Sequence, residues 1–180
     1  YVRFNGRGDN FILSLYPIRR MFMFRKMRRF KQEISQEECI RVLKEQPRGV
    51  LSMMGEDGYP YGVPLDHWYD EKTGTICFHG AKEGHKIDAI RKNNKVSYCV
   101  YDQGYRNAGE WALNIQSVIV FGTIHEVKDQ DRAMEICRQL CLKFTDDQDY
   151  IEKEIKNAGS RVLCWEIQMD HMTGKLVNES

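Results

Sequence analysis

Apolar and polar residues recur with two different periods along this 180-residue chain, and the periods separate expected strands from expected helices. Short apolar or alternating runs predict strands over residues 49–54, 59–69, 75–79, 96–101, 117–127 and 161–169. Helical spacing of apolar residues covers 35–46, 87–93, 129–144 and 146–157. The order of these segments predicts an α+β, mainly β fold: six mostly antiparallel strands in a barrel or strongly coiled sheet, with flanking helices.

Local signals add detail to this plan. Ser35, followed three residues later by Glu38, has the spacing of a capping box and predicts a helix start. Pro60 and Pro64 interrupt the run over 59–69, and proline cannot donate to a strand ladder. Pro64 therefore indicates an edge, a bulge or a place where something other than a strand meets the backbone. Gly122 suits a bulge or a barrel bend.

Charge is distributed unevenly along the chain. Residues 1–32 carry nine Lys and Arg and one Asp, whereas residues 33–180 carry 18 Lys and Arg and 25 Asp and Glu. The acidic remainder argues against a nucleic-acid-binding core, which needs basic groups for phosphates. No apolar run reaches the roughly 18 residues of a membrane span. Because residues 1–22 lack a steady apolar period, we expect an extra or disordered segment there and one domain over 23–180.

The cysteines and several histidines suggest structural roles. The six cysteines, at positions 39, 77, 99, 137, 141 and 164, contain no CxxC pair, so we expect free thiols and a cytoplasmic protein. Cys137 and Cys141 are one helical turn apart, but no neighbouring ligand completes a metal site, and we expect none. Single histidines on strands, at positions 67, 79 and 125, are typical of hydrogen-bonded structural residues.

The first candidate site lies in residues 78–88. Lys82, His85 and Lys86 fall within five residues at the expected start of a helix, and Gly80 and Gly84 permit close backbone approach. Free N–H groups at a helix start, together with basic side chains, favour a phosphate group. The alternative is a solvated basic turn before an ordinary amphipathic helix.

The second candidate site is the interrupted strand Gly58–Leu65. Its prolines leave backbone groups unpaired, and a flat heteroaromatic ring with polar edges could take them up while apolar neighbours pack on its face. The alternative is an irregular edge strand that proline protects from mispairing.

Four segments together resemble the 5-nitroimidazole-resistance (Nim-type) branch of the pyridoxamine 5′-phosphate oxidase-like FMN-binding proteins. They are GYPYGVPL (58–65), FHGAKEGHKIDAIR (78–91), SVIVFG (117–122) and HMTGK (171–175). The resemblance extends from about Met23 to Lys175. It implies a six-stranded antiparallel split β-barrel, a homodimer, and FMN in two equivalent clefts at the subunit interface.

The resemblance also implies roles for individual residues. Lys82, His85 and Lys86 would hold the FMN phosphate or lie beside it, and the run Tyr61, Gly62, Val63 and Pro64 would follow the isoalloxazine ring. Ser117, the segment 111–116, His171 and Thr173 would approach the ring or the substrate, from the same chain or from the partner. No residue stands out as an obligatory acid or base, but His85 and His171 are candidate proton donors, because imidazole titrates near neutral pH.

The implied activity is FMN-dependent reduction of small electrophiles such as nitro-aromatic, 5-nitroimidazole-like compounds. The alternatives are a non-catalytic flavin-binding or redox-sensing protein and a pyridoxamine-phosphate-oxidase-type enzyme, and a larger flavin or haem could replace FMN. The oxidase ranks lower because no second basic cluster is present for the phosphate of its substrate. Residues 66–68 and 103–113 depart from the family pattern, and we expect them to shape substrate preference.

Overall fold

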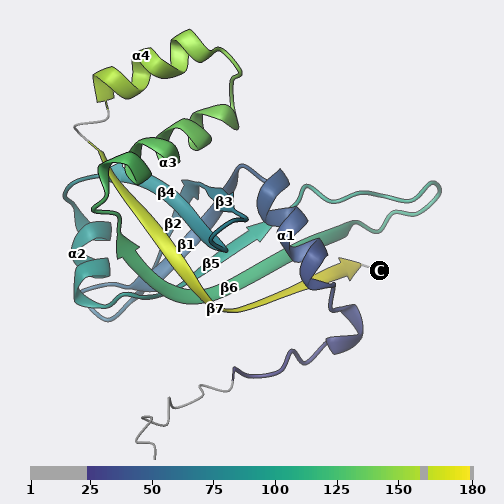
Figure 1. Cartoon of the computed structure of the whole chain (residues 1–180). Coiled ribbons are helices and arrows are strands. Elements are labelled where there is room, and N and C mark those ends of the chain that lie inside the picture. Colours follow the sequence, from purple (N-terminus) through teal and green to yellow (C-terminus); the bar gives the residue numbers. More distant parts are fainter. Residues whose placement is uncertain (1–23, 159–161, 179–180) are drawn as a thin grey trace, which may run out of the picture.

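An antiparallel, curled sheet of seven strands forms the centre of the computed structural model, which describes residues 24–158 and 162–178 (Figure 1). The strand order is β2-β1-β5-β6-β7-β4-β3. The strands are β1 (Arg48–Met54), β2 (Pro60–Asp66), β3 (Trp68–Asp70), β4 (Thr75–Ala81), β5 (Lys95–Tyr101), β6 (Asn114–Glu126) and β7 (Val162–Asn178). The α+β prediction is confirmed, while the segment predicted over residues 1–22 lies outside the described residues.

The helices follow the predicted apolar periods. They are η1 (Phe30–Gln32), α1 (Gln36–Glu45), α2 (His85–Lys92), α3 (Gln130–Leu142) and α4 (Gln148–Ala158). The capping box that begins α1 is confirmed, because Ser35 Oγ accepts from Glu38 N and the Glu38 carboxylate accepts from Ser35 N. None of the described helices is long and apolar enough to cross a membrane.

The prediction of six strands is wrong by one, because the run expected over 59–69 is two strands. The chain turns at His67, whose imidazole is fully buried. Its Nε2 lies 2.8 Å from the carbonyl oxygen of Leu43 and its Nδ1 lies 3.1 Å from the hydroxyl of Tyr98. Before this turn β2 pairs with β1, and after it β3 pairs with β4 at the other end of the sheet. Burial, with the nearby Lys143 ammonium, lowers the pKa of His67 to about 4.

Two apolar clusters hold the described chain together. The larger one joins the inner face of the sheet to α1 and α2, through residues such as Val42, Leu43 and Ile87. The smaller one packs α3 against β4 and β7 through Ile136 and Leu140. The inner core therefore leaves the opposite face of β1, β5, β6 and β7 as an outer face.

The bulge expected at Gly122 is confirmed. The register between β6 and β7 shifts between Phe121 and Gly122. A Cβ at Gly122 would overlap the carbonyl oxygen of Gln168, so this close approach requires glycine.

Candidate functional site

The loop between β4 and α2 places an uncapped helix start beside basic side chains. Gly84 precedes the helix with φ of 117°, which a residue with a Cβ rarely adopts. Side chains cap α1, through Ser35, and α3, through Asp129, whereas no side chain caps α2. Ile87 N donates to the carbonyl oxygen of Gly84 at 2.8 Å, so the N–H groups of His85 and Lys86 and the positive end of the helix dipole are left for another acceptor, and an anion fits them.

Lys86 is a half-buried cation without a carboxylate partner. Its side chain folds back over β4, so that Nζ lies 2.8 Å from the position that a Cβ would take at Gly80. Burial lowers the pKa of Lys86. Among the residues that the structure describes, neither Lys86 nor the exposed Lys82 forms an ion pair with a carboxylate. A partly desolvated cation of this kind favours an anionic ligand.

His85 connects this loop to the β1–β2 hairpin. Its ring stacks on the ring of Tyr61 with centroids 4.3 Å apart and an interplanar angle of 16°. A Cβ at Gly55, just after β1, would lie 3.6 Å from His85 Nε2. The structure thus brings together the two candidate sites of the sequence, the basic loop and the interrupted strand.

Among the described strands, β2 lies at the edge of the sheet and pairs with β1 alone. Tyr61 and Val63 pack against the inner core, so Gly62 and Pro64 point to the outer face, opposite Ser52 and Val50 of β1. Of the four residues expected along a ring, two therefore face the core side and two face the outer side. Strand β2 keeps one edge free of any described strand, as its prolines predicted.

Ser117, His171 and Thr173 lie on the outer face, at the far side of the sheet from β2. Along β6, buried Val118 and Val120 alternate with outward Ser117, Ile119 and Phe121. In the register with β7, Ile119 pairs with Thr173 and Phe121 pairs with His171. A stacked ring from the N-terminal segment covers one side of His171: the centroid of Phe24 is 4.5 Å from that of the imidazole, with an interplanar angle of 5°.

One chain does not bring the two groups of candidate residues together. A single cross-strand row runs through Gly62, Ser52, Ser97, Phe121 and His171. Gly62 and His171 are thus separated by four strand spacings, or about 19 Å along the sheet. A flat ring bound at β2 cannot reach His171 or Thr173 of the same sheet face.

The loop between β5 and β6 projects beyond the sheet (Figure 1). It is internally tied, because Arg106 Nε donates to the carbonyl oxygen of Trp111 at 2.9 Å and Tyr105 pairs with Asn114. The side chain of Trp111 is nevertheless 73% exposed. This loop, which the sequence marked as a departure from the family pattern, does not contact the basic loop of its own chain in any described interaction.

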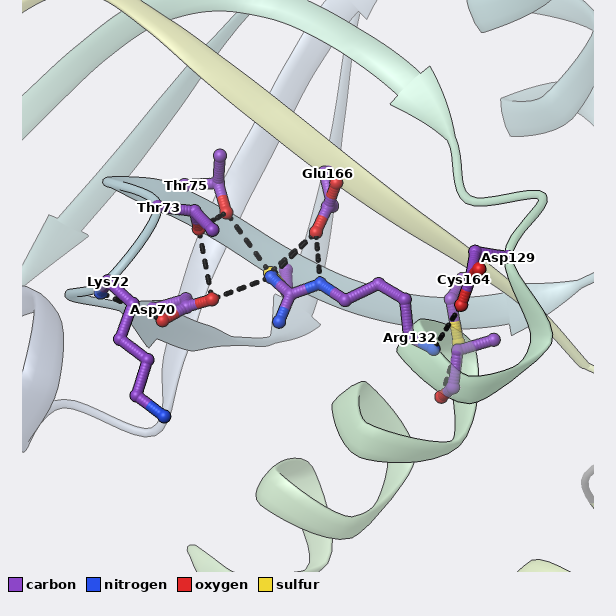
Figure 2. A network of polar contacts seen from close by, with 10 residues as sticks. Asp70, Lys72, Thr73, Thr75, Asp129, Arg132, Cys164 and Glu166 are labelled. Carbon is purple, nitrogen blue, oxygen red and sulfur yellow. Dashed lines mark hydrogen bonds and ion pairs between the residues drawn. The ribbon is translucent and has the colours of Figure 1, made fainter.

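Sequence reasoning missed an ion network around Arg132 (Figure 2). Arg132 Nη2 lies 2.7 Å from Asp70 Oδ2 and 2.7 Å from Glu166 Oε1, and the guanidinium packs over the ring of Trp68. Burial acts to raise the pKa of Asp70, but hydrogen bonds from Lys72, Thr73 and Arg132 outweigh it and hold the pKa below its ordinary value. The only feature of this network that neighbouring residues encode is the turn after Asp70. Arg132 and Glu166 lie far from Asp70 in the sequence, so no local pattern predicts that they meet.

The network is fully paired, so its role is structural. Asp70 Oδ1 accepts from the backbone N–H of Lys72 at 3.0 Å, and its Oδ2 accepts from Thr73 Oγ1 at 2.9 Å. The side chain of Asp70 is only 4% exposed. With every charge engaged, the network joins α3 to β3 and β7.

Neither of two open cavities in the described chain is lined by a residue of the basic loop, 82–86. Two open cavities of about 360 and 430 Å³ lie around Trp68 and around His79, and of the candidate residues only Pro64 lines one of them. Cys137 does not lie with Cys141 in a ligand cluster; its Sγ is 3.7 Å from Sγ of Cys164. Within residues 24–158 and 162–178, no group of three or more His, Cys, Asp or Glu residues could hold a metal ion.

Comparisons with solved structures support the fold. A candidate 5-nitroimidazole antibiotic resistance protein from Bacteroides thetaiotaomicron superposes with a TM-score of 0.69 at 20% identity, over 81% of this chain and 87% of that one. A conserved hypothetical protein from Mycobacterium tuberculosis superposes with a TM-score of 0.71 at 14% identity, over 83% of this chain and 90% of that one. An FAD-binding protein from Mycobacterium smegmatis superposes with a TM-score of 0.60 at 19% identity, over 82% of this chain and 99% of that one. The predicted split barrel is confirmed.

A search of curated protein sequences finds no match to this chain. The family model described as pyridoxamine 5′-phosphate oxidase, in contrast, matches residues 35–176, which include the basic loop, the interrupted strand and the β6–β7 pair. The chain therefore belongs to the pyridoxamine 5′-phosphate oxidase family.

Proposed function

We propose that this protein is an FMN-dependent oxidoreductase that reduces small electrophiles such as nitro-aromatic compounds. The observation that carries the proposal is the half-buried Lys86 at the uncapped start of α2, which has no carboxylate partner among the described residues. A phosphate there would receive hydrogen bonds from the free N–H groups of the helix and from the basic side chains of the loop.

The family and its neighbours support a flavin as the group that carries this phosphate. Two of the similar structures are described as FAD-binding proteins, from Mesorhizobium loti and Mycobacterium smegmatis. FMN suits this chain because the basic loop offers one phosphate site at a helix start. The nitroimidazole-resistance neighbour supports nitro-aromatic substrates.

The flavin would lie along the free edge of β2. Gly62 leaves space for a flat ring against the strand, and the unpaired edge beyond Pro64 offers backbone groups to the polar rim of the ring. When bound, the flavin supplies two-electron transfer from a reduced nicotinamide or another donor to the substrate. The chain's own residues would anchor the phosphate, hold the ring against β2 and leave its other face to the substrate.

The separation of the two residue groups leads us to a homodimer. His171 and Thr173 can reach a ring bound at β2 only if they come from a second copy of the chain. The outer face suits such an interface, because it exposes apolar side chains: Met54, Tyr101, Ile119 and Phe121 are 47%, 61%, 40% and 41% exposed. A two-fold axis would then create two equal sites, and the loop carrying Trp111 would reach toward the partner's site.

The cellular compartment and the proton source of the reaction are also part of the proposal. The six free cysteines fit the reducing cytoplasm, where we place the protein. His85 beside the phosphate loop and His171 on the outer face are the candidate imidazoles of the proposed site, and either could deliver a proton to the reduced substrate.

Purified protein tests the proposed function in two steps. Its absorption spectrum should show flavin bands, and anaerobic mixing with NADH or NADPH and a nitroimidazole should consume the reductant. A colourless chain that takes up no FMN would contradict the proposal, and a Soret band would identify haem in its place. Bound FMN that passes electrons to no acceptor would leave a flavin carrier.

A matched pair of variants tests the dimer. Ile119→Arg places a charge in the proposed interface and should give a monomer without flavin, whereas Met134→Arg on α3 adds the same charge at a position of similar exposure away from it. Light scattering and flavin stoichiometry are the measurements. A monomer that retains one FMN per chain would refute the shared site.

A further inference from the structure

A cluster of three rings lies on the outer face, outside the inner core. The centroid of Phe24 is 4.5 Å from that of His171 and 5.5 Å from that of Phe121, and the last two are 6.5 Å apart. The three planes lie within 28° of one another. The arrangement is that of offset-stacked aromatic rings.

The segment that carries Phe24 is anchored to the end of β7. Glu33 forms a bridge with Lys175, Ile34 N donates to the carbonyl oxygen of Gly174 at 3.1 Å, and Gln36 Nε2 donates to that of Met172 at 3.3 Å. Residues 24–36 thus follow the strand that bears His171 and Thr173 (Figure 1).

Simple burial does not account for the position of Phe24. Val118 and Val120 are fully buried in the inner core, on the opposite face of β6 from Phe121, so Phe24 on the outer face does not cover them. Phe30 in the same segment is 66% exposed, so the segment does not bury each of its aromatic side chains. Phe24 is selectively placed against the imidazole.

We propose that Phe24 is a specificity-determining residue of the substrate pocket, where it forms with Phe121 an aromatic wall beside His171 that selects planar, electron-poor aromatic substrates. The inference rests on the proposed function, in which His171 faces the partner's flavin. A nitro-aromatic ring has its electron density withdrawn and stacks well on the electron-rich face of a phenyl ring. An acceptor without an aromatic ring gains nothing from this wall.

Phe24→Leu in the flavin-loaded protein is the test, because leucine keeps the apolar contact and removes the aromatic face. KM for a nitrobenzene derivative should rise about threefold to tenfold, the range expected for loss of one aromatic pair. The rate with ferricyanide and the dissociation constant of FMN should stay at their wild-type values. Phe30→Leu is the matched control, from the same segment, and should change none of these quantities.

A second readout does not depend on turnover. The ring of Phe24 should shift the His171 side-chain resonances in the NMR spectrum, and Phe24→Leu should remove that shift while the dimer stays folded. Equal losses with the nitro-aromatic and with ferricyanide, or an unchanged KM for both, would overturn the inference while the flavin remains bound. A wild-type chain that binds no flavin would overturn the proposed function and this inference with it.

Discussion

Arg132 and Lys86 are two partly buried cations that lie against the same strand, β4, and they differ in what surrounds them. The Arg132 guanidinium lies 3.5 Å from Sγ of Cys77 and is paired with the carboxylates of Asp70 and Glu166. The Lys86 ammonium lies over Gly80, with no carboxylate partner among the described residues. One cation completes a network, and the other is left with an unmet charge.

This difference separates a structural charge from a binding charge. A buried ion whose partners are all present stabilises the arrangement that holds them, and removing it leaves the partners unpaired. A desolvated ion without a partner costs stability in the free protein, and that cost is recovered when an anion binds. Two cations that lie against one strand can therefore serve the fold in one place and the ligand in another.

The largest effect on stability is expected from replacing Arg132, the paired cation. Arg132→Met should lower the free energy of unfolding by about 3 kcal/mol or more, because Asp70 would remain buried without its partner. Denaturant unfolding measures it. Arg138→Met on the same helix removes an ion pair to the exposed Glu152 and should cost less than about 1 kcal/mol. Equal costs for the two variants would contradict a structural role for the Arg132 network.

A buried base that stays neutral gives the next effect. The pKa of His67 is about 4 in the folded chain, below its ordinary value of 6.5. As pH falls through this window the unfolded chain takes up a proton first, so stability present above pH 6.5 should be lost toward pH 4, by up to about 3 kcal/mol. Unfolding curves at several pH values measure the slope. His67→Gln should lack this contribution, and an unchanged slope would contradict the assignment.

Replacement of the unpaired cation should have little effect on stability. Lys86→Met keeps the length of the side chain and removes a desolvated charge, so flavin-free protein should unfold within about 1 kcal/mol of wild type, or be more stable. Thermal or denaturant unfolding without FMN makes the comparison with Arg132→Met direct. A loss as large as that of Arg132→Met would mean that Lys86 has a structural partner.

The smallest effect is expected from truncation. Removal of residues 1–20 keeps Phe24 and the rest of the segment 24–36, which lies along β7. The flavin content and the dimer should therefore not change. Light scattering and absorbance measure both. A colourless monomer would show that the N-terminal arm is structural.

The strand and helix pattern could be predicted because it depends on local periodicity. The Ser35–Glu38 capping box and the bulge at Gly122 also act over a few residues, and both were predicted correctly. The division of 59–69 into β2 and β3 could not be predicted, because it depends on the contacts of His67 with Leu43 and Tyr98, which are distant in sequence.

The candidate site likewise has a part that neighbouring residues predict and a part that depends on distant contacts. Adjacent residues such as Lys82, His85 and Lys86 are brought together by the sequence itself, and a helix start beside them is locally encoded. The stacking of Phe24 on His171 joins the two ends of the described chain, and no local pattern predicts it. The separation of Gly62 from His171 depends on strand order, which requires the whole sheet.

Binding of FMN and of riboflavin, which lacks the phosphate, tests most directly the claim that the unpaired loop holds a phosphate. Lys82→Ala or Lys86→Ala should weaken FMN about tenfold to a hundredfold, as expected for one charge-assisted hydrogen bond, and should leave the dissociation constant of riboflavin at its wild-type value. Lys92→Ala, at the other end of α2, should change neither. Wild-type affinities for both ligands in both loop variants would show that the loop is only a solvated basic turn.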